Sequence, residues 1–100
     1  MISVKIHQSD PKIIAICDAE LIGKRFEDES RQIDINERFY RGEMMDEQKV
    51  KELIAKMVDD YCSFNIVGQR SIDVAMKVGI IDAKKIIYIK KIPVALVFNL

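Results

Sequence analysis

Residues 65–71 carry the side chains best suited to binding chemistry. They read Asn65-Ile66-Val67-Gly68-Gln69-Arg70-Ser71, which predicts a short apolar strand that ends at a glycine and leads directly into a helix. The free N–H groups and the positive dipole end of a helix attract phosphate or carboxylate. The Arg70 guanidinium can hold such a group through two hydrogen bonds. We therefore predict an anion- or ligand-binding site formed by Asn65, Gly68, Gln69, Arg70 and Ser71, although an ordinary strand-to-helix connection has the same pattern.

A second candidate site is the segment Arg38-Phe39-Tyr40-Arg41. Aromatic rings and guanidinium groups are the groups with which proteins bind single-stranded RNA or a protein partner. Aromatic residues on a half-buried segment are also common in hydrophobic cores. The sequence lacks a complete RNA-binding signature, so we predict Arg38, Phe39, Tyr40 and Arg41 as partner-binding residues, with a core role for the aromatic rings as the alternative.

No set of residues predicts catalysis or a metal site. Catalysis requires a base or nucleophile that is positioned by a partner, and the single histidine, His7, lies where the first strand is expected to end. His7 and Cys17 can form a pair only if a hairpin places them opposite each other. Cys17 and Cys62 lack the spacing of a redox pair or a zinc site and are predicted as buried apolar residues. We therefore expect no catalytic residue, no metal and no cofactor.

Length and composition favour a single globular domain. Of the 100 residues, 49% are hydrophobic and 32% are charged, which suffices for one core over residues 1–100. The sequence has no apolar run long enough to span a membrane, and its N-terminal residues lack the long apolar stretch that is typical of a signal peptide. We therefore expect a cytoplasmic protein without membrane contact. The high content of Lys, Glu and Ile is compatible with a thermophilic source.

The charge is neutral overall but unevenly distributed. Residues 1–41 have a balance of −1, residues 42–60 of −3, and residues 61–100 of +4, the last from six basic and two acidic side chains. A basic segment attracts polyanions. Lysines beside edge strands also prevent sheets from aggregating, so the C-terminal lysines have two explanations.

The spacing of apolar residues predicts the elements that must position these side chains. Alternating or continuous apolar residues predict strands at residues 2–7, 12–17, 31–35, 63–67, 86–89 and 94–98. Helices are predicted at residues 19–26 after the cap Asp18, from Asp46 to Tyr61, and at residues 68–78 before Gly79. In the third helix Ile72, Ala75 and Met76 should face inward. Residues 36–45 have no clear period and are predicted as a loop or an irregular edge strand.

These elements predict an α+β fold. The first two strands should pair as a hairpin, and the helices do not alternate strictly with the strands, which disfavours an all-parallel sheet. We expect a two-layer sandwich in which helices lie mainly on one face of a mixed or largely antiparallel sheet.

Several short motifs together resemble a known family. They are the run from Ala15 to Lys24, Phe39-Tyr40-Arg41-Gly42, Asn65-Ile66-Val67-Gly68, and the run from Ala75 to Asp82. In this order they resemble the archaeal family called domain of unknown function 424. The resemblance implies a small archaeal, cytoplasmic α+β protein and no assigned reaction. Members of the family often carry a histidine directly after the proline near the C-terminus, whereas this chain has Val94 there, which removes one candidate catalytic group.

Three functions are compatible with these features. The leading hypothesis is a non-enzymatic binding module for RNA or a ribonucleoprotein or translation-related assembly, which would use residues 68–71, residues 39–41 and the C-terminal lysines. The second is a small enzyme that acts on a phosphorylated or carboxylated metabolite held at the Gly68 turn. The third is a homo-oligomeric scaffold assembled through edge-to-edge pairing of residues 94–98.

Overall fold

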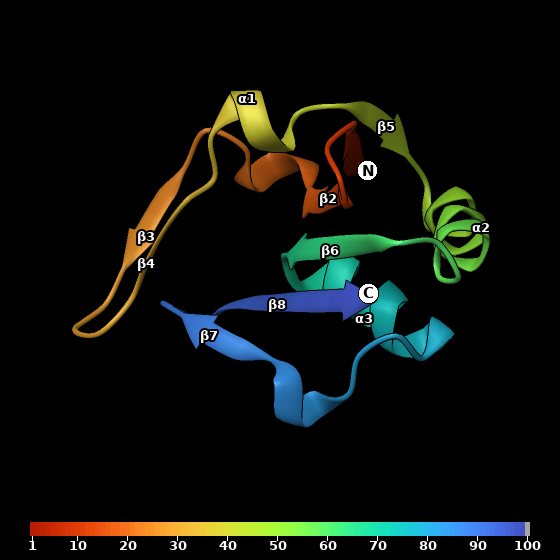
Figure 1. Cartoon of the computed structure of the whole chain (residues 1–100). Helices are drawn as coiled ribbons and strands as arrows, with labels where there is room; N and C mark the ends of the chain where they lie inside the picture. The colour runs from red at the N-terminus through yellow and green to blue at the C-terminus, as the bar shows by residue number, and fades with distance from the viewer. Residues whose placement is uncertain (100) are drawn as a thin grey trace.

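The computed structural model describes residues 1–99 and contains two sheets and three α-helices (Figure 1). The strands are β1 (Ile2–His7), β2 (Lys12–Asp18), β3 (Arg25–Glu27), β4 (Gln32–Asp34), β5 (Glu43–Met45), β6 (Cys62–Val67), β7 (Ile87–Ile89) and β8 (Ile92–Asn99). The helices are α1 (Glu37–Tyr40), α2 (Glu47–Met57) and α3 (Gln69–Val78), with short 3-10 turns at Ala19–Leu21 and Ala83–Lys85.

The main sheet is mixed, with strand order β5-β1-β2-β6-β8-β7. β1 and β2 form the predicted antiparallel hairpin, in which Val4 lies opposite Ile16. β2 and β6 are parallel, and β6 and β8 are antiparallel. The predicted α+β class, with a mixed sheet and helices mainly on one face, is confirmed.

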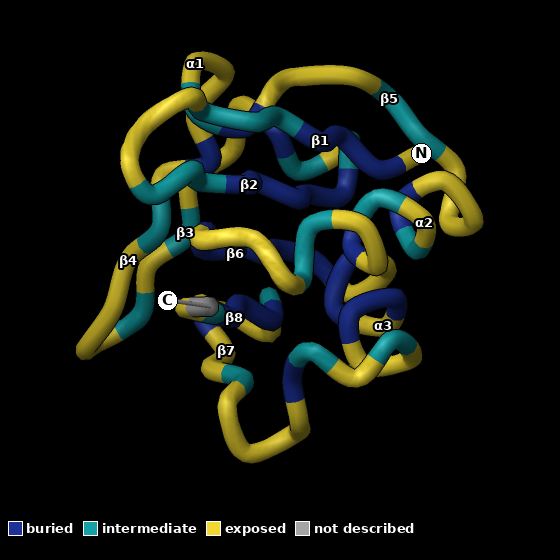
Figure 2. The backbone as a smooth tube through the Cα atoms, turned by 45° about the vertical axis from the view of Figure 1, so that its right-hand side comes forward, coloured by how far each residue is buried: buried dark blue, intermediate teal, exposed yellow. Residues whose placement is uncertain are grey.

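Helices α2 and α3 cover one face of this sheet and enclose the larger core. The Asp46 carboxylate accepts a hydrogen bond of 2.9 Å from the Lys49 N–H and so caps α2 as predicted. Gly79 ends α3 in a left-handed conformation, with φ of 82°. The buried residues of this core are Ile2, Val4, Ile14, Ile16, Val50, Ile54, Cys62, Phe64, Ile66, Ile72, Val74, Ala75, Ile81 and Ala95. Figure 2 shows this buried backbone in dark blue, in contrast to the exposed turn of the β3–β4 hairpin.

The opposite face is only partly covered, by the chain between β2 and β5. The β3–β4 hairpin and α1 enclose a second, smaller core there, made of Ala15, Cys17, Ile22, Ile35, Tyr40, Val67, Ile89 and Val94. In Figure 1 the hairpin extends on the side of the molecule opposite α2. The helix-free face therefore has a buried part under α1 and an exposed part beside it.

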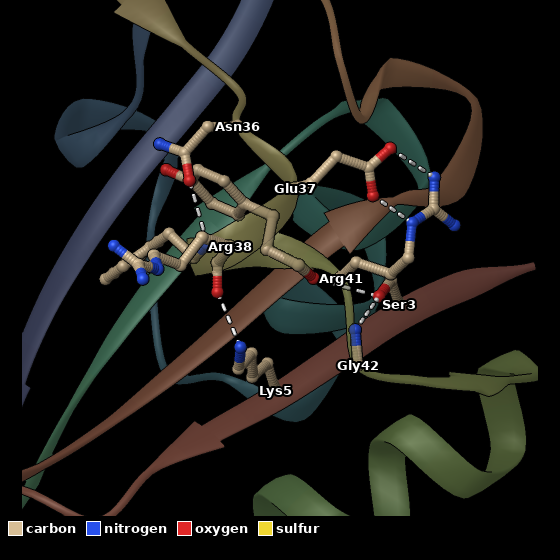
Figure 3. Close-up of polar contacts among 9 residues, drawn as sticks. Ser3, Lys5, Asn36, Glu37, Arg38, Arg41 and Gly42 are labelled. Carbon is tan, nitrogen blue, oxygen red and sulfur yellow. Dashed lines mark hydrogen bonds and ion pairs between the residues drawn. The ribbon is translucent and has the colours of Figure 1, made fainter.

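Hydrogen bonds hold α1 on β1 (Figure 3). The Ser3 hydroxyl donates to the Tyr40 carbonyl (2.9 Å) and accepts from the Gly42 N–H (2.8 Å). A Cβ at Gly42 would lie 2.1 Å from the Val4 carbonyl oxygen, so only glycine allows this approach of the two backbones. The Lys5 ammonium donates to the Arg38 carbonyl. α1 is thus fixed to the sheet although it has only one turn.

The structure corrects five local predictions. Residues 19–26 are not a helix, because the backbone after Gly23 pairs with residues 32–35 to form the β3–β4 hairpin. Residues 36–45, predicted as a loop or an irregular edge strand, do contain an edge strand, β5, but also the unpredicted helix α1. β8 begins at Ile92 and includes Pro93, opposite Tyr88. The inner face of α3 includes Val74 in place of Met76, which is exposed, and Tyr61 lies outside α2 and is also exposed.

No helix within residues 1–99 has the length and apolar character needed to cross a bilayer.

Candidate functional site

The predicted anion-binding turn already holds an anion, which is the side chain of Asp18. One carboxylate oxygen accepts hydrogen bonds from the Ser71 N–H (2.8 Å) and the Ser71 hydroxyl (2.7 Å), and the other accepts one from the Arg70 N–H (3.1 Å). Asp18 is buried, with 4% of its surface exposed. The donors at the start of α3 therefore face a carboxylate of the chain itself, and an external anion would have to displace it.

The parallel pairing of β2 and β6 creates this contact. Cys17 lies beside Val67 in the register, so the next residues, Asp18 and Gly68, leave the sheet at the same edge. Gly68 has φ of 105°, and a Cβ there would lie 2.4 Å from the Asp18 Cγ atom. The glycine is thus required twice, for its backbone conformation and for the close approach of the carboxylate.

Other predicted residues of this site also have partners within the chain. Arg70 forms an ion pair with Glu20, and Gln69 donates to the Asp73 carboxylate at 2.8 Å. Asn65 does not join them, because it lies on the helix-free face and lines a cavity there. At the start of α3, Arg70 and Ser71 donate to Asp18 rather than face open space. The predicted cap of a helix at residue 19 by Asp18 is wrong for the same reason.

The predicted partner-binding segment divides into buried and exposed side chains. Tyr40 is 6% exposed and belongs to the smaller core. Phe39 stacks on His7 with ring centroids 4.5 Å apart. Arg41 forms an ion pair with Glu37 on the same turn, and Arg38 is exposed. The segment therefore does not present both aromatic rings and both guanidinium groups to a partner.

A cavity of about 400 Å³ lies where the β3–β4 hairpin faces β7 and β8, and we call it the hairpin cavity. Its apolar walls are Ile33, Ile87, Ile89, Val94, Ala95 and Leu96. Four polar residues also line it: Gln32, Tyr40, Asn65 and Lys85. A mostly apolar wall with a few polar groups, in a volume of this size, is typical of ligand sites.

Three of these polar side chains have no hydrogen-bond partner within the described residues. They are the Tyr40 hydroxyl, the Asn65 amide and the Lys85 ammonium, whereas Gln32 accepts a hydrogen bond from Arg25. Burial raises the pKa of Tyr40 to about 12, with a smaller contribution from the nearby Cys17 thiol. The hydroxyl therefore keeps its proton near neutral pH and can both donate and accept.

Lysines flank the edge strand β7 beside this cavity. Lys84 and Lys85 precede β7, and Lys90 and Lys91 form the two-residue turn to β8, with φ of 49° and 68°. All four are exposed, and none forms an ion pair in the part of the chain that the structure describes. They account for the basic character that the sequence predicts for this part of the chain.

Large apolar side chains of β8 are also exposed, and one of them, Leu96, lines the hairpin cavity together with Lys85. Leu96 is 54% exposed and Phe98 is 69% exposed. Leu96 lies opposite Asn65 and Phe98 opposite Ser63, which places both on the helix-free face. We call Leu96, Phe98 and the four lysines 84, 85, 90 and 91 the β8 surface.

The structure does not assemble a Cys-His pair. His7 lies opposite Ile13 and Cys17 opposite Ser3, so about 13 Å of strand separates the two residues, at roughly 3.3 Å per residue. Burial, with the negative charges of Asp18 and Glu20, raises the pKa of Cys17 to about 12. Such a thiol is inert at neutral pH. Within residues 1–99 no three side chains of the metal-binding types are grouped as ligands.

Sequence reasoning missed most of the hairpin cavity and the true role of Asp18. The cavity brings together Tyr40 and Asn65, which the sequence assigned to two different sites, with Lys85 from a third segment. The sequence does show that β2 and β6 each end in a turn. It does not show that the two strands are parallel, and only this pairing places Asp18 beside the start of α3.

Comparison with known proteins identifies the family. A crystal structure of an uncharacterized conserved protein from Methanopyrus kandleri is similar, with a TM-score of 0.81 and 23% identity over 99% of this chain and 91% of that one. At this identity the likeness shows the fold. No curated protein matches the sequence. The family model described as protein of unknown function (DUF424) matches residues 6–100. The chain therefore belongs to the DUF424 family.

Proposed function

We propose that this chain is a non-enzymatic module that binds single-stranded RNA, alone or within a ribonucleoprotein, through its β8 surface. The observation that carries the proposal is the exposure of apolar side chains on β8 together with lysines on both sides of its neighbour β7 that have no ion-pair partner in the described chain. Proteins that bind single strands use these two elements together, one for the bases and one for the phosphates.

The charge of the region favours a polyanion over a neutral partner. Four lysines flank β7, whereas the two acidic residues of the C-terminal segment are already engaged. Asp73 accepts a hydrogen bond from Gln69, and Asp82 accepts one from the Lys84 N–H. Because exposed lysines without ion pairs attract phosphates by charge alone, RNA binding here should weaken as salt is added.

The apolar part of the region supplies contact area for unpaired bases. Phe98 presents an exposed ring on a rigid strand, and Leu96 lies two residues before it on the same face. Stacking of a base on an aromatic ring is worth about 1–3 kcal/mol. Double-stranded RNA hides its base faces, so the proposal is specific for single strands.

The acidic turn of the β3–β4 hairpin limits the path that a bound RNA strand can follow on the surface. Glu27, Asp28 and Glu29 lie at this turn, and two backbone N–H groups donate to Asp28 and lower the pKa of its carboxyl. These carboxylates repel phosphates. We therefore expect the RNA to follow β7 and β8 rather than the turn of the hairpin.

Fluorescence anisotropy with a labelled single-stranded RNA tests the proposal. The affinity should fall as salt rises, with a log–log slope of about −0.7 for each phosphate that is neutralised. Replacement of both Lys84 and Lys85 by Ala should reduce that slope by about 1.4. The matched control replaces Lys49 and Lys56 of α2, which removes the same charge on the helix-covered side.

The control decides between a specific surface and simple loss of charge. We expect the α2 variant to bind RNA as the wild type does, and double-stranded RNA of the same sequence to bind more weakly. Equal losses in the two double variants, or no binding of any single-stranded RNA at low salt, would contradict the proposal.

A further inference from the structure

We propose that the hairpin cavity is a binding pocket for one nucleobase, and that the Tyr40 hydroxyl and the Asn65 amide hydrogen-bond to the edge of that base. The inference builds on the proposed RNA binding, because the cavity adjoins the β8 surface and shares Leu96 and Lys85 with it. The same chemistry can come from a base of an RNA strand or from a free nucleotide.

The polar groups of the cavity indicate a ligand with hydrogen-bonding groups. The Tyr40 ring is largely buried, and its hydroxyl has no partner within residues 1–99. No fully buried side-chain nitrogen or oxygen of the described residues lacks a partner, so the Tyr40 hydroxyl oxygen is accessible to solvent, and Tyr40 is one of the residues that line the cavity. Asn65 lines the same cavity, and its amide also has no partner. These two side chains, from α1 and β6, thus form no hydrogen bond within the described chain and are free to bind a ligand.

The arrangement of donors and acceptors matches the edge of a base. An amide offers a donor and an acceptor side by side, which is how Asn pairs with adjacent groups of a base. The Tyr40 hydroxyl stays protonated because burial raises the pKa of Tyr40 to about 12, so it can donate or accept as the base requires. The hydroxyl and the amide can together hydrogen-bond to the edge of a base, and neither group is charged.

The walls and the rim fit the rest of a nucleotide. Ile33 of β4 and Leu96 of β8 are among the apolar residues that line the cavity and can contact the faces of a flat ring. Lys85 is the cationic residue of the lining, and Lys84 precedes it. A phosphate attached to the bound base would therefore meet positive charge. A carboxylated apolar ligand would use the lysine but would leave the amide and the hydroxyl unpaired.

An NMR titration of the full chain, labelled with ¹⁵N, tests the inference. The probes are AMP, CMP, GMP and UMP, with ribose 5-phosphate as the ligand that lacks a base. At least one nucleotide should shift the backbone signals of Asn65, Ala95 and Leu96, whereas ribose 5-phosphate should not. If the base comes from a strand, a single-stranded RNA oligonucleotide shifts these signals at lower concentration than the mononucleotide. If the ligand is a free nucleotide, the mononucleotide binds at least as well.

Conservative variants test the two hydrogen-bonding groups. Tyr40→Phe removes only the hydroxyl and should weaken nucleotide binding by about fivefold to tenfold, the effect of one lost hydrogen bond. Asn65→Ala should weaken it at least as much. Tyr61→Phe is the matched control, because Tyr61 is exposed and does not line this cavity, and its binding should equal that of the wild type.

The outcomes separate this inference from the proposed RNA binding. Nucleotide affinity of Tyr40→Phe and Asn65→Ala equal to that of the wild type, or equal shifts by ribose 5-phosphate, would overturn the base pocket. Salt-dependent binding of RNA could then still hold. Shifts of cavity signals by a mononucleotide, without binding of any oligonucleotide at low salt, would instead support the pocket and contradict the RNA-binding role.

Discussion

Removal of the Asp18 carboxylate should destabilise the fold far more than an ordinary surface substitution. The carboxylate accepts three hydrogen bonds from the first turn of α3, over distances of 2.7–3.1 Å, and is 4% exposed. In Asp18→Ala these donors lose their acceptor in a site that water hardly reaches. We expect a loss of about 3 kcal/mol in the free energy of unfolding, from about 1–3 kcal/mol for each unsatisfied buried group and partial relaxation.

Asp18→Asn should cost less, about 1.5–2 kcal/mol, because the remaining oxygen can still accept from Ser71 while the amide nitrogen faces the Arg70 N–H. Urea unfolding measures both losses, and thermal unfolding of Asp18→Ala should occur roughly 12–24 °C lower. Asp73→Asn is the control, since Asp73 is an exposed acidic residue of the same helix, and it should change the stability by no more than about 0.5 kcal/mol.

An added anion distinguishes an occupied turn from an open one. Formate or phosphate should raise the melting temperature of Asp18→Ala by filling the vacated site at the start of α3, but should leave the wild type unchanged. Two results would refute the reasoning. One is an unfolding free energy of Asp18→Ala within about 0.5 kcal/mol of the wild type. The other is equal stabilisation of both proteins by phosphate, which would mean that the turn is open to external anions.

Three further changes test other parts of the structure. Gly68→Ala should lower the unfolding free energy by at least about 2 kcal/mol, because its Cβ would lie 2.4 Å from Asp18 Cγ at a φ of 105°, and a wild-type urea midpoint would disprove this. Arg70→Ala removes an exposed ion pair with Glu20 and a long, exposed hydrogen bond of 3.5 Å to the Met1 carbonyl, so stability should change by less than about 1 kcal/mol and RNA affinity should stay constant. A tenfold loss of affinity would restore the turn as a binding site. The raised pKa of Cys17 contributes stability that is complete below pH 9 and is lost as pH rises toward 12, since the unfolded thiol ionises first. Urea unfolding from pH 8 to 11 should show this decline in the wild type and a smaller one in Cys17→Ala, and equal declines would contradict the assignment.

Local sequence signals predicted most of the fold. The alternation in β1, the turn before Lys12, the cap Asp46 and the glycine after α3 all act within a few residues, and the elements that these four signals predicted are present. The sequence-based predictions failed where pairing with distant residues decides the secondary structure. Residues 19–26 were predicted as one helix, but residues 25–27 form a strand because residues 32–34 lie opposite them.

The candidate site was less predictable because it depends on contacts between distant segments. Tyr40 and Asn65 were both singled out by the sequence, but for separate roles, and they line the same cavity in a fold in which Ser3 holds α1 on β1. The Asp18 contact likewise requires the parallel pairing of β2 with β6. The spacing of residues along the chain encodes neither the position of α1 on β1 nor the pairing of β2 with β6. Residue types could therefore suggest which residues belong to the site, but not how they are arranged.

Mapping of bound RNA onto the chain is the most direct test of the proposed function. Single-stranded RNA is added at low salt to ¹⁵N-labelled protein, and the backbone signals that move are assigned. The proposal predicts shifts at Lys84, Lys85, Leu96 and Phe98, which reverse as salt is added, with no change along α2. Shifts confined to the helix-covered side, or no shift at any RNA concentration, would contradict it.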